Sequence, residues 1–196
     1  MRKLIVNEFM SLDGVAQAPG GAEEDPSGGF AHGGWHMQYM EDEPTQQWVL
    51  RSIVEAGGFL LGRRTYEIFA AYWPNAPEEE QVIAEPLNSK PKYVASRTLT
   101  EPLEWQGSTL LGDELAAAVA ALKDEEGGDL HVIGSTELVQ SLLGHGLVDE
   151  LRLMIDPVLL GGGKSFLRDD GALRSLRLVD GQLTDRGAIL ATYAPA

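Results

Sequence analysis

Three short segments of the chain combine glycine, hydroxyl and guanidinium groups in a way that suits an anionic ligand. They are Gly62-Arg63-Arg64-Thr65, Ser96-Arg97-Thr98 and Gly134-Ser135-Thr136. Each follows a short apolar run typical of a buried strand, and α/β sheets bind ligands beyond the carboxyl ends of their strands. Glycine lets the backbone approach a ligand closely, while arginine side chains and the first N–H groups of a helix bind phosphate. The segments therefore predict a phosphate-binding edge, although the first two, taken singly, are explained as well by surface turns.

The segments differ in the part of a phosphorylated ligand that each suits. Ser96 and Arg97 could hold a second phosphate, such as the ribose 2′-phosphate that distinguishes NADP from NAD. The turn at Gly134 suits a pyrophosphate. It is not part of a GxGxxG motif, and no GxxxxGK[ST] occurs, so neither a standard Rossmann domain nor a P-loop is indicated. The glycine-rich run 161–165 is interpreted as a loop that shapes the site, with a plain turn as the alternative.

Acidic and basic side chains near the first strand offer a second kind of chemistry. Asp13 and Glu8 could be polar groups that face a substrate, whereas Asp13 next to Gly14 is equally typical of a tight turn. The sequence has no GxSxG elbow for a catalytic serine. His32 and His36 have helix-like spacing, but their Gly-rich surroundings and the lack of a third ligand nearby argue against a zinc site.

Alternating patterns along the chain predict the elements that must position these groups. Strands are expected at 4–10, 59–61, 92–95, 130–133, 149–155, 173–179 and 188–193, with shorter candidates at 103–105 and 108–111. Helices are expected at 44–56, 65–72, 114–126 and 136–143, and the polar connection 74–88 could hold one more short helix. This order predicts an α/β fold with a central, mostly parallel mixed sheet and an antiparallel C-terminal edge.

A Gly-rich, acidic segment from residue 11 to 43 shows little periodicity. Loops of this length inside a compact domain are uncommon, and they are usually functional or disordered. Residues 17–43 carry several aromatic side chains, a composition that favours a flexible lid over a solvated tail. We expect this lid to close over a pocket, with Trp35 and Tyr39 on the substrate side.

The composition indicates a single globular domain of 196 residues. A formal net charge of −15 disfavours nucleic acid and anionic membranes as partners. The sequence contains no cysteine, which excludes disulfides and thiolate metal sites. No signal peptide and no apolar run of membrane-spanning length are evident, so the cytoplasm is the expected location.

Taken together and in order, the motifs resemble the dihydrofolate-reductase-like family, and within it the reductase domain of the bifunctional riboflavin-biosynthesis deaminase–reductase. The matching segments are 4–16, 62–67, 94–97, 131–138, 148–153 and 157–166, so the resemblance covers most of the chain. It implies a three-layer sandwich with helices on both faces of the sheet. It also implies a stand-alone reductase, because no deaminase-like zinc segment precedes the reductase motifs.

The resemblance gives the candidate residues expected roles, all in binding the cofactor NADPH. Gly62, Arg63, Arg64 and Thr65 would hold phosphate, Ser96 and Arg97 the adenosine side, Gly134, Ser135 and Thr136 the pyrophosphate, and Phe9, Gly14, Val15 and Ala16 the nicotinamide. True dihydrofolate reductases carry an acidic residue on the helix before the Gly-Arg-x-Thr element. Here that place falls near Gln46, so folate reduction is not implied.

We therefore expect an NADPH-dependent reductase that passes hydride to a small heterocyclic or carbonyl substrate. A pteridine or a 5-amino-6-(5-phosphoribosylamino)uracil-type compound would fit that description. Asp13 is the expected catalytic residue, no metal is expected, and the family resemblance implies a homodimer. The alternatives are a non-catalytic nucleotide- or small-molecule-binding protein with the same fold and, more remotely, a metal-dependent hydrolase that uses Asp13 and Glu8.

Overall fold

The computed structural model describes residues 1–167 and 169–196, which form two compact units. The first unit comprises 1–6 and 50–149, and the second comprises 7–49 and 150–196. Two elements run from one unit into the other along the chain, namely strand β1 (Leu4–Ser11) and helix α1 (Glu43–Val54). The two units are described in turn.

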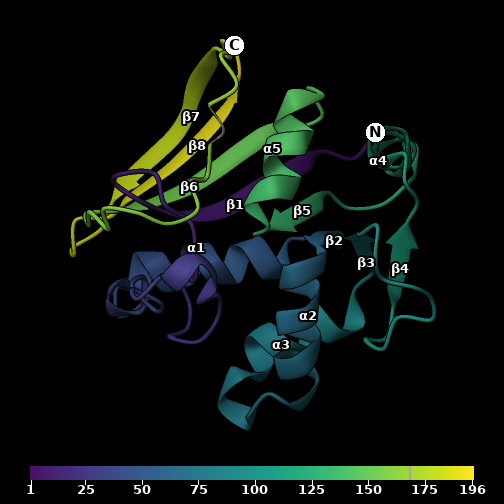
Figure 1. Ribbon diagram of the computed structural model, residues 1–196, viewed down its shortest axis with the longest axis horizontal. Helices are drawn as coiled ribbons and strands as arrows, with labels where there is room; N and C mark the ends of the chain where they lie inside the picture. The colour runs from purple at the N-terminus through teal and green to yellow at the C-terminus, as the bar shows by residue number, and fades with distance from the viewer. Residues whose placement is uncertain (168) are drawn as a thin grey trace. The chain divides into compact units, whose positions relative to one another are not determined.

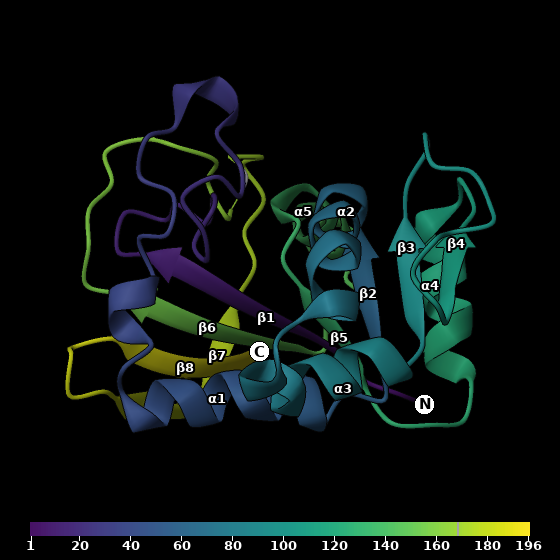
Figure 2. The same cartoon turned by 90° about the horizontal axis from the view of Figure 1, so that it is seen from below.

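The first unit is built on parallel strands. They are β2 (Gly58–Gly62), β3 (Lys92–Ala95), β4 (Ser108–Leu111) and β5 (Leu130–Ile133), and their hydrogen-bonded order is β4-β3-β2-β5-β1 (Figure 2). β2 pairs in parallel with both β3 and β5, so that Gly62 lies opposite Ala95 and Leu60 opposite Val132. Because these strands are parallel, their carboxyl ends meet at one edge.

Helices connect most of the parallel strands of the first unit, and the segment after β3 leads to β4 without a helix. The helices are α2 (Arg63–Tyr72), α3 (Gln81–Ser89), α4 (Leu115–Asp124) and α5 (Thr136–Gly144), with short 3₁₀ turns η3 (Trp73–Asn75) and η4 (Glu78–Glu80). Phe59 and Leu61 point from β2 into a cluster with Tyr66 of α2 and Leu87 of α3. Leu60, which alternation places on the opposite face, is also fully buried. The sheet is therefore covered on both faces, as expected for parallel strands.

The second unit ends in antiparallel strands. β6 (Glu150–Asp156) pairs with β8 (Ile189–Pro195), which pairs with β7 (Leu176–Leu183), giving the order β1-β6-β8-β7. Figure 1 shows β7 and β8 as a long yellow hairpin. A bulge between Leu178 and Asp180 shifts the register of β7 against β8. Two short 3₁₀ turns, η1 (Ser27–Gly29) and η2 (Met37–Tyr39), interrupt the long segment that precedes α1.

The mixed α/β architecture expected from the sequence is confirmed, with eight strands among the described residues. Two local expectations are wrong. Residues 103–105 form no strand, because the buried Trp105 side chain donates to Asn88 Oδ1 and anchors a loop. The strand expected at 173–179 is β7 at 176–183, because the bulge lets its pairing with β8 continue. The connection 74–88 holds most of α3, in agreement with the short helix expected there, together with η4 and part of η3.

Within the described part of the chain, no helix is long and apolar enough to cross a membrane.

Candidate functional site

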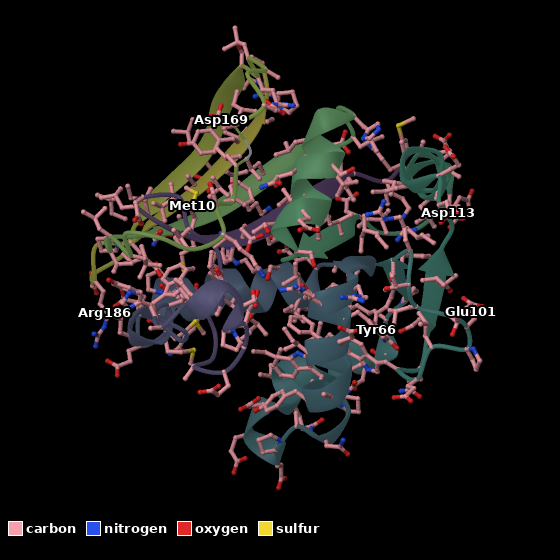
Figure 3. The ribbon with its side chains drawn as sticks, viewed as in Figure 1. Met10, Tyr66, Glu101, Asp113, Asp169 and Arg186 are labelled. Carbon is pink, nitrogen blue, oxygen red and sulfur yellow. The ribbon has the colours of Figure 1, made fainter. Side chains whose placement is uncertain are left out.

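Two strand ends of the first unit meet tightly at Gly62 and Ser135. A Cβ atom added to Gly62 would collide with the side chain of Ser135, so only glycine allows this contact. Thr65 Oγ1 and Ser135 Oγ lie 2.9 Å apart, at hydrogen-bonding distance. Gly134 and Ser135 both have positive φ, of 63° and 60°, and this turn brings the start of α5 beside the start of α2. Figure 3 labels Tyr66, which lies on α2 four residues after Gly62.

The helix N-termini at this junction offer backbone donors. Neither the α2 N-cap, Gly62, nor the α5 N-cap, Ser135, makes a side-chain capping hydrogen bond. The first N–H groups of a helix have no partner within the helix, and the helix dipole places a partial positive charge there. A left-handed residue followed by a helical one also gathers successive N–H groups into an anion-binding concavity. The junction thus has the donors that a pyrophosphate requires.

Two arginines, Arg63 and Arg97, belong to the segments that form this edge. Arg63 Nη1 donates to Thr98 Oγ1 at 2.9 Å, which links the segment after β2 to the segment after β3. Ser96 Oγ accepts hydrogen bonds from the N–H groups of Thr98 and Leu99 at 3.1 and 3.0 Å, so its hydroxyl organises the local turn. Arg97 is exposed and has no ion-pair partner among the described residues. Its guanidinium can meet an anion from solvent.

The three predicted phosphate-binding segments therefore lie at one edge of one unit. Thr65 contacts Ser135, and Arg63 contacts Thr98. The roles of the individual residues toward NADPH remain predictions. The donor set fits the cofactor, since it combines uncapped helix N-termini, hydroxyl groups and arginines within a chain of strongly negative charge.

Asp13, the expected catalytic residue, lies in the second unit and organises a loop. Its carboxylate accepts hydrogen bonds from Ser11 Oγ at 2.6 Å and from the N–H groups of Leu160 and Gly161, the latter at 2.8 Å. These donors lower the pKa of Asp13 to about 2. The carboxylate is therefore ionised at neutral pH and is unsuited to donate a proton. Its contacts match the turn interpretation better than the catalytic one.

The predicted nicotinamide segment belongs to the same loop assembly. Val15 forms an antiparallel bridge with Ser165, the Ala16 N–H donates to the Lys164 carbonyl, and the Phe166 N–H donates to the Gly14 carbonyl. Val15 and Ala16 are buried. Through these bonds the segment 14–16 and the glycine-rich run 161–165 form one ordered structure, consistent with the interpretation of that run as a shaping loop.

Residues 17–43, the predicted lid, are held by many internal contacts. Gln17 Nε2 donates to the carbonyls of Asp25 and Ser27, and Lys164 forms an ion pair with Asp25. Trp35 is buried and its Nε1 donates to the Gln17 carbonyl at 2.8 Å. The predicted substrate-side residues Trp35 and Tyr39 are thus both packed inside this segment. Lid motion stays a prediction.

Sequence reasoning missed a buried acid–base cluster in the second unit. His36 Nδ1 lies 2.7 Å from Asp156 Oδ2, and both side chains are buried. His36 stacks on Phe9 with ring centroids 4.0 Å apart. Glu8 is buried on β1, and its burial, with the charge of Glu24 as a smaller cause, raises its pKa to about 8. In the sequence His36 stood out only for its spacing from His32, because its partner Asp156 is 120 residues away.

The mixed sheet and its helices define a dihydrofolate-reductase-like fold. A riboflavin biosynthesis-like protein from Shewanella sp. PV-4 aligns with a TM-score of 0.65 at 20% identity, covering 99% of each chain. A pyrimidine reductase-like protein from Corynebacterium diphtheriae gives 0.68 at 16% identity, covering 100% of this chain and 92% of its own. Dihydrofolate reductase from Enterococcus faecalis, complexed with NADP(H) and RAB-propyl, gives 0.63 at 15% identity, covering 98% of this chain and 96% of its own.

The sequence places the chain more narrowly. Residues 2–190 match the model of the RibD C-terminal domain, and the chain belongs to that family. Bacillus subtilis (strain 168) YyaP is 28% identical over 198 residues, covering 98% of this chain and 94% of YyaP. The family is reductase-like, which supports oxidoreductase activity in general terms.

Proposed function

We propose that the protein is an NADPH-dependent reductase that transfers hydride to a small heterocyclic or carbonyl substrate. The junction of Gly62, Thr65 and Ser135 carries the proposal. There two helix N-termini without side-chain caps lie side by side. Arg63 begins α2 at this junction and contacts Thr98, the residue after Arg97. This arrangement suits the pyrophosphate of a dinucleotide. NADPH would supply the hydride, while the protein supplies orientation and electrostatics.

Arg97 would decide between NADPH and NADH. Its exposed guanidinium follows β3, and no described acidic residue pairs with it. A ribose 2′-phosphate bound there would gain a charge-assisted hydrogen bond of about 1.5–3 kcal/mol. That free energy corresponds to roughly 10- to 100-fold in affinity.

Fluorescence titration of the protein with NADPH and NADH tests this proposal. We expect tighter binding of NADPH, and we expect Arg97→Ala to weaken NADPH about 10- to 100-fold while leaving NADH unchanged. Arg51→Ala, which removes an exposed arginine from α1, is the matched control and should bind both dinucleotides as the wild type does. A wild type that binds neither dinucleotide would reject the reductase and favour the non-catalytic binding protein.

We infer the substrate class from the family of the chain. Pyrimidine reductase-like and riboflavin biosynthesis-like proteins share the fold. This favours a ribosylaminouracil or pteridine substrate with a reducible C=N or C=O bond. Gln46 is exposed and its Nε2 donates to the Met40 carbonyl, so no acid stands at the place used in folate reduction. NADPH use suits the cytoplasm, where we expect the protein to act.

The β7–β8 hairpin supports a homodimer as part of the proposal. Every residue of β7 is exposed. The bulge places Leu178 and Leu183 on the same face, because their β8 partners, Tyr193 and Ile189, are four residues apart. The β7 and β8 positions on this face carry no charged side chain. In a chain of net charge −15, such a face is where a second copy can approach without repulsion.

A further inference from the structure

The buried pair of His36 and Asp156 has the geometry of an oriented proton carrier. His36 Nδ1 is hydrogen-bonded to Asp156 Oδ2 at 2.7 Å. His36 Nε2 and Asp156 Oδ1 have no hydrogen-bonding partner among the described residues. A carboxylate bound to one ring nitrogen fixes the imidazole plane and its tautomer, so that the other nitrogen can serve a reacting group. A buried polar atom without a partner costs about 1–3 kcal/mol, which a ligand atom can recover.

The surroundings of His36 hold it in place. The imidazole stacks on Phe9 with an interplanar angle of 22°, and Phe9 also contacts Trp48 of α1. Trp35 and Tyr39, which lie in the same segment as His36, have ring centroids 6.2 and 6.5 Å from its imidazole. Aromatic contacts on several sides leave the imidazole little freedom to rotate. Phe9 is also the residue whose main chain is expected to flank the nicotinamide.

The ionisable groups that face His36 come from several elements. Asp156 lies on β6, Glu24 in the segment before η1, and Tyr39 on η2. Burial raises the pKa of Glu24, and the charge of His36 opposes that rise. Glu24 in turn raises the pKa of Glu8. Among these groups the direct contact of His36 is with Asp156, and Glu24 acts on His36 and Glu8 through its charge.

We propose that His36 Nε2 is the proton donor of the reduction and that Asp156 is its positioning residue. This inference rests on the proposed reductase function. Hydride from NADPH would add to the carbon of a C=N or C=O bond, and the bond's π electrons would move to the nitrogen or oxygen. That atom takes the proton from Nε2–H, so an N–H or O–H bond forms as Nε2–H breaks. NADPH becomes NADP⁺, and solvent returns one proton to His36.

The test compares His36→Asn, Asp156→Asn and the control His32→Asn, an exposed histidine in the same segment. The probes are 7,8-dihydrobiopterin and 5-amino-6-(5-phosphoribosylamino)uracil, each with saturating NADPH. We expect His36→Asn to lower kcat about 100-fold or more, as loss of a general acid does. Asp156→Asn should lower it about 10-fold. Dissociation constants for NADPH should change less than twofold in all three variants.

A second readout does not depend on turnover. The imidazole ¹⁵N shifts of the NADP⁺-bound wild type should show Nδ1 protonated toward Asp156, and Asp156→Asn should alter that tautomer balance. The Nε2 resonance should move when either probe is added. A purely structural pair would leave Nε2 unchanged by both probes.

The outcomes separate this inference from the proposed function. A wild type that fails to bind NADPH rejects the reductase itself. Turnover of either probe at the wild-type rate by His36→Asn overturns the role of His36 while the reductase stands. If the wild type binds NADPH but turns over neither probe, the Nε2 resonance is the deciding measurement. A shift of this resonance on addition of a probe supports the inference, and an unchanged resonance overturns it.

Discussion

Glu8 shows how burial changes the chemistry of a single residue. Its side chain lies on β1 within the second unit, and its Oε2 has no hydrogen-bonding partner among the described residues. Removal from water disfavours the charged carboxylate, and Glu24 nearby disfavours it further. The pKa therefore rises from 4.5 to about 8, and Glu8 is mostly protonated at neutral pH. It is an acid kept neutral by its surroundings.

This raised pKa gives a stability prediction with a definite sign. Between pH 4.5 and 8 the unfolded chain loses the Glu8 proton while the native protein keeps it, so the free energy of unfolding falls as pH rises. At about 1.4 kcal/mol per pKa unit, the loss has an upper bound of about 5 kcal/mol. Glu8→Gln should remove this fall. Urea unfolding should find it more stable than wild type at pH 8.5 and nearly equal at pH 4.

Glu23→Gln is the matched control, because Glu23 is exposed in the segment that also contains Glu24. Its free energy of unfolding should follow that of the wild type at both pH values. If Glu8→Gln were no more stable than wild type at pH 8.5, the assignment of a neutral, buried Glu8 would be incorrect.

At the scale of elements, two lysines cap helix C-termini in the first unit. Lys90 Nζ donates to the carbonyls of Ile53 and Val54 at the end of α1. Lys92 is fully buried, and its Nζ donates to the carbonyls of Leu87, Asn88 and Lys90 at 2.8–3.1 Å. Cations stabilise a helix C-terminus through its orphan carbonyls and its dipole. These contacts tie the helix ends to the start of β3.

Lys92→Met should destabilise the protein by about 3 kcal/mol, because it leaves buried carbonyls at the end of α3 without donors. Burial lowers the Lys92 pKa to about 8, so the native protein loses this proton before the unfolded chain does. The wild type should therefore gain stability relative to the variant between pH 8 and 10.5. Chemical unfolding at pH 7 and 10 measures both effects. Lys3→Met, at an exposed lysine, is the control and should unfold like the wild type. If Lys92→Met were as stable as the wild type, the capping role of Lys92 would be contradicted.

At the scale of the whole molecule, the proposed dimer depends on an exposed face of the β7–β8 hairpin. Leu178 and Leu183 are 60% and 72% exposed on β7. Sedimentation velocity should find a dimer for the wild type and a monomer for Leu178→Glu, because a buried, unpaired charge opposes association. Leu159→Glu replaces another exposed leucine, 71% exposed, and should leave the dimer intact. A monomeric wild type would contradict the proposed dimer.

Much of the architecture was readable in the sequence, because local patterns carry it. The apolar runs at 59–61, 92–95 and 130–133 fall within observed strands. Glycines and hydroxyl residues follow these runs and indicate turns, as at Gly134 and Ser135. The backbone conformation of such turns depends on residues that are close in the sequence. The candidate phosphate edge was predictable for the same reason, since parallel strands bring their ends together.

The partners of the acid–base groups and of the capping lysines were decided by the tertiary structure alone. Asp156 meets His36 across 120 residues, and Asp13 meets Gly161 across 148. No local pattern reports such distant partners. The same limit explains β7, whose extent depends on a bulge formed against β8. Sequence alone thus determined the order of elements and the candidate phosphate-binding turns, because both are short-range properties. The tertiary structure decided which side chains are buried together, and burial beside a specific partner is what changes their chemistry.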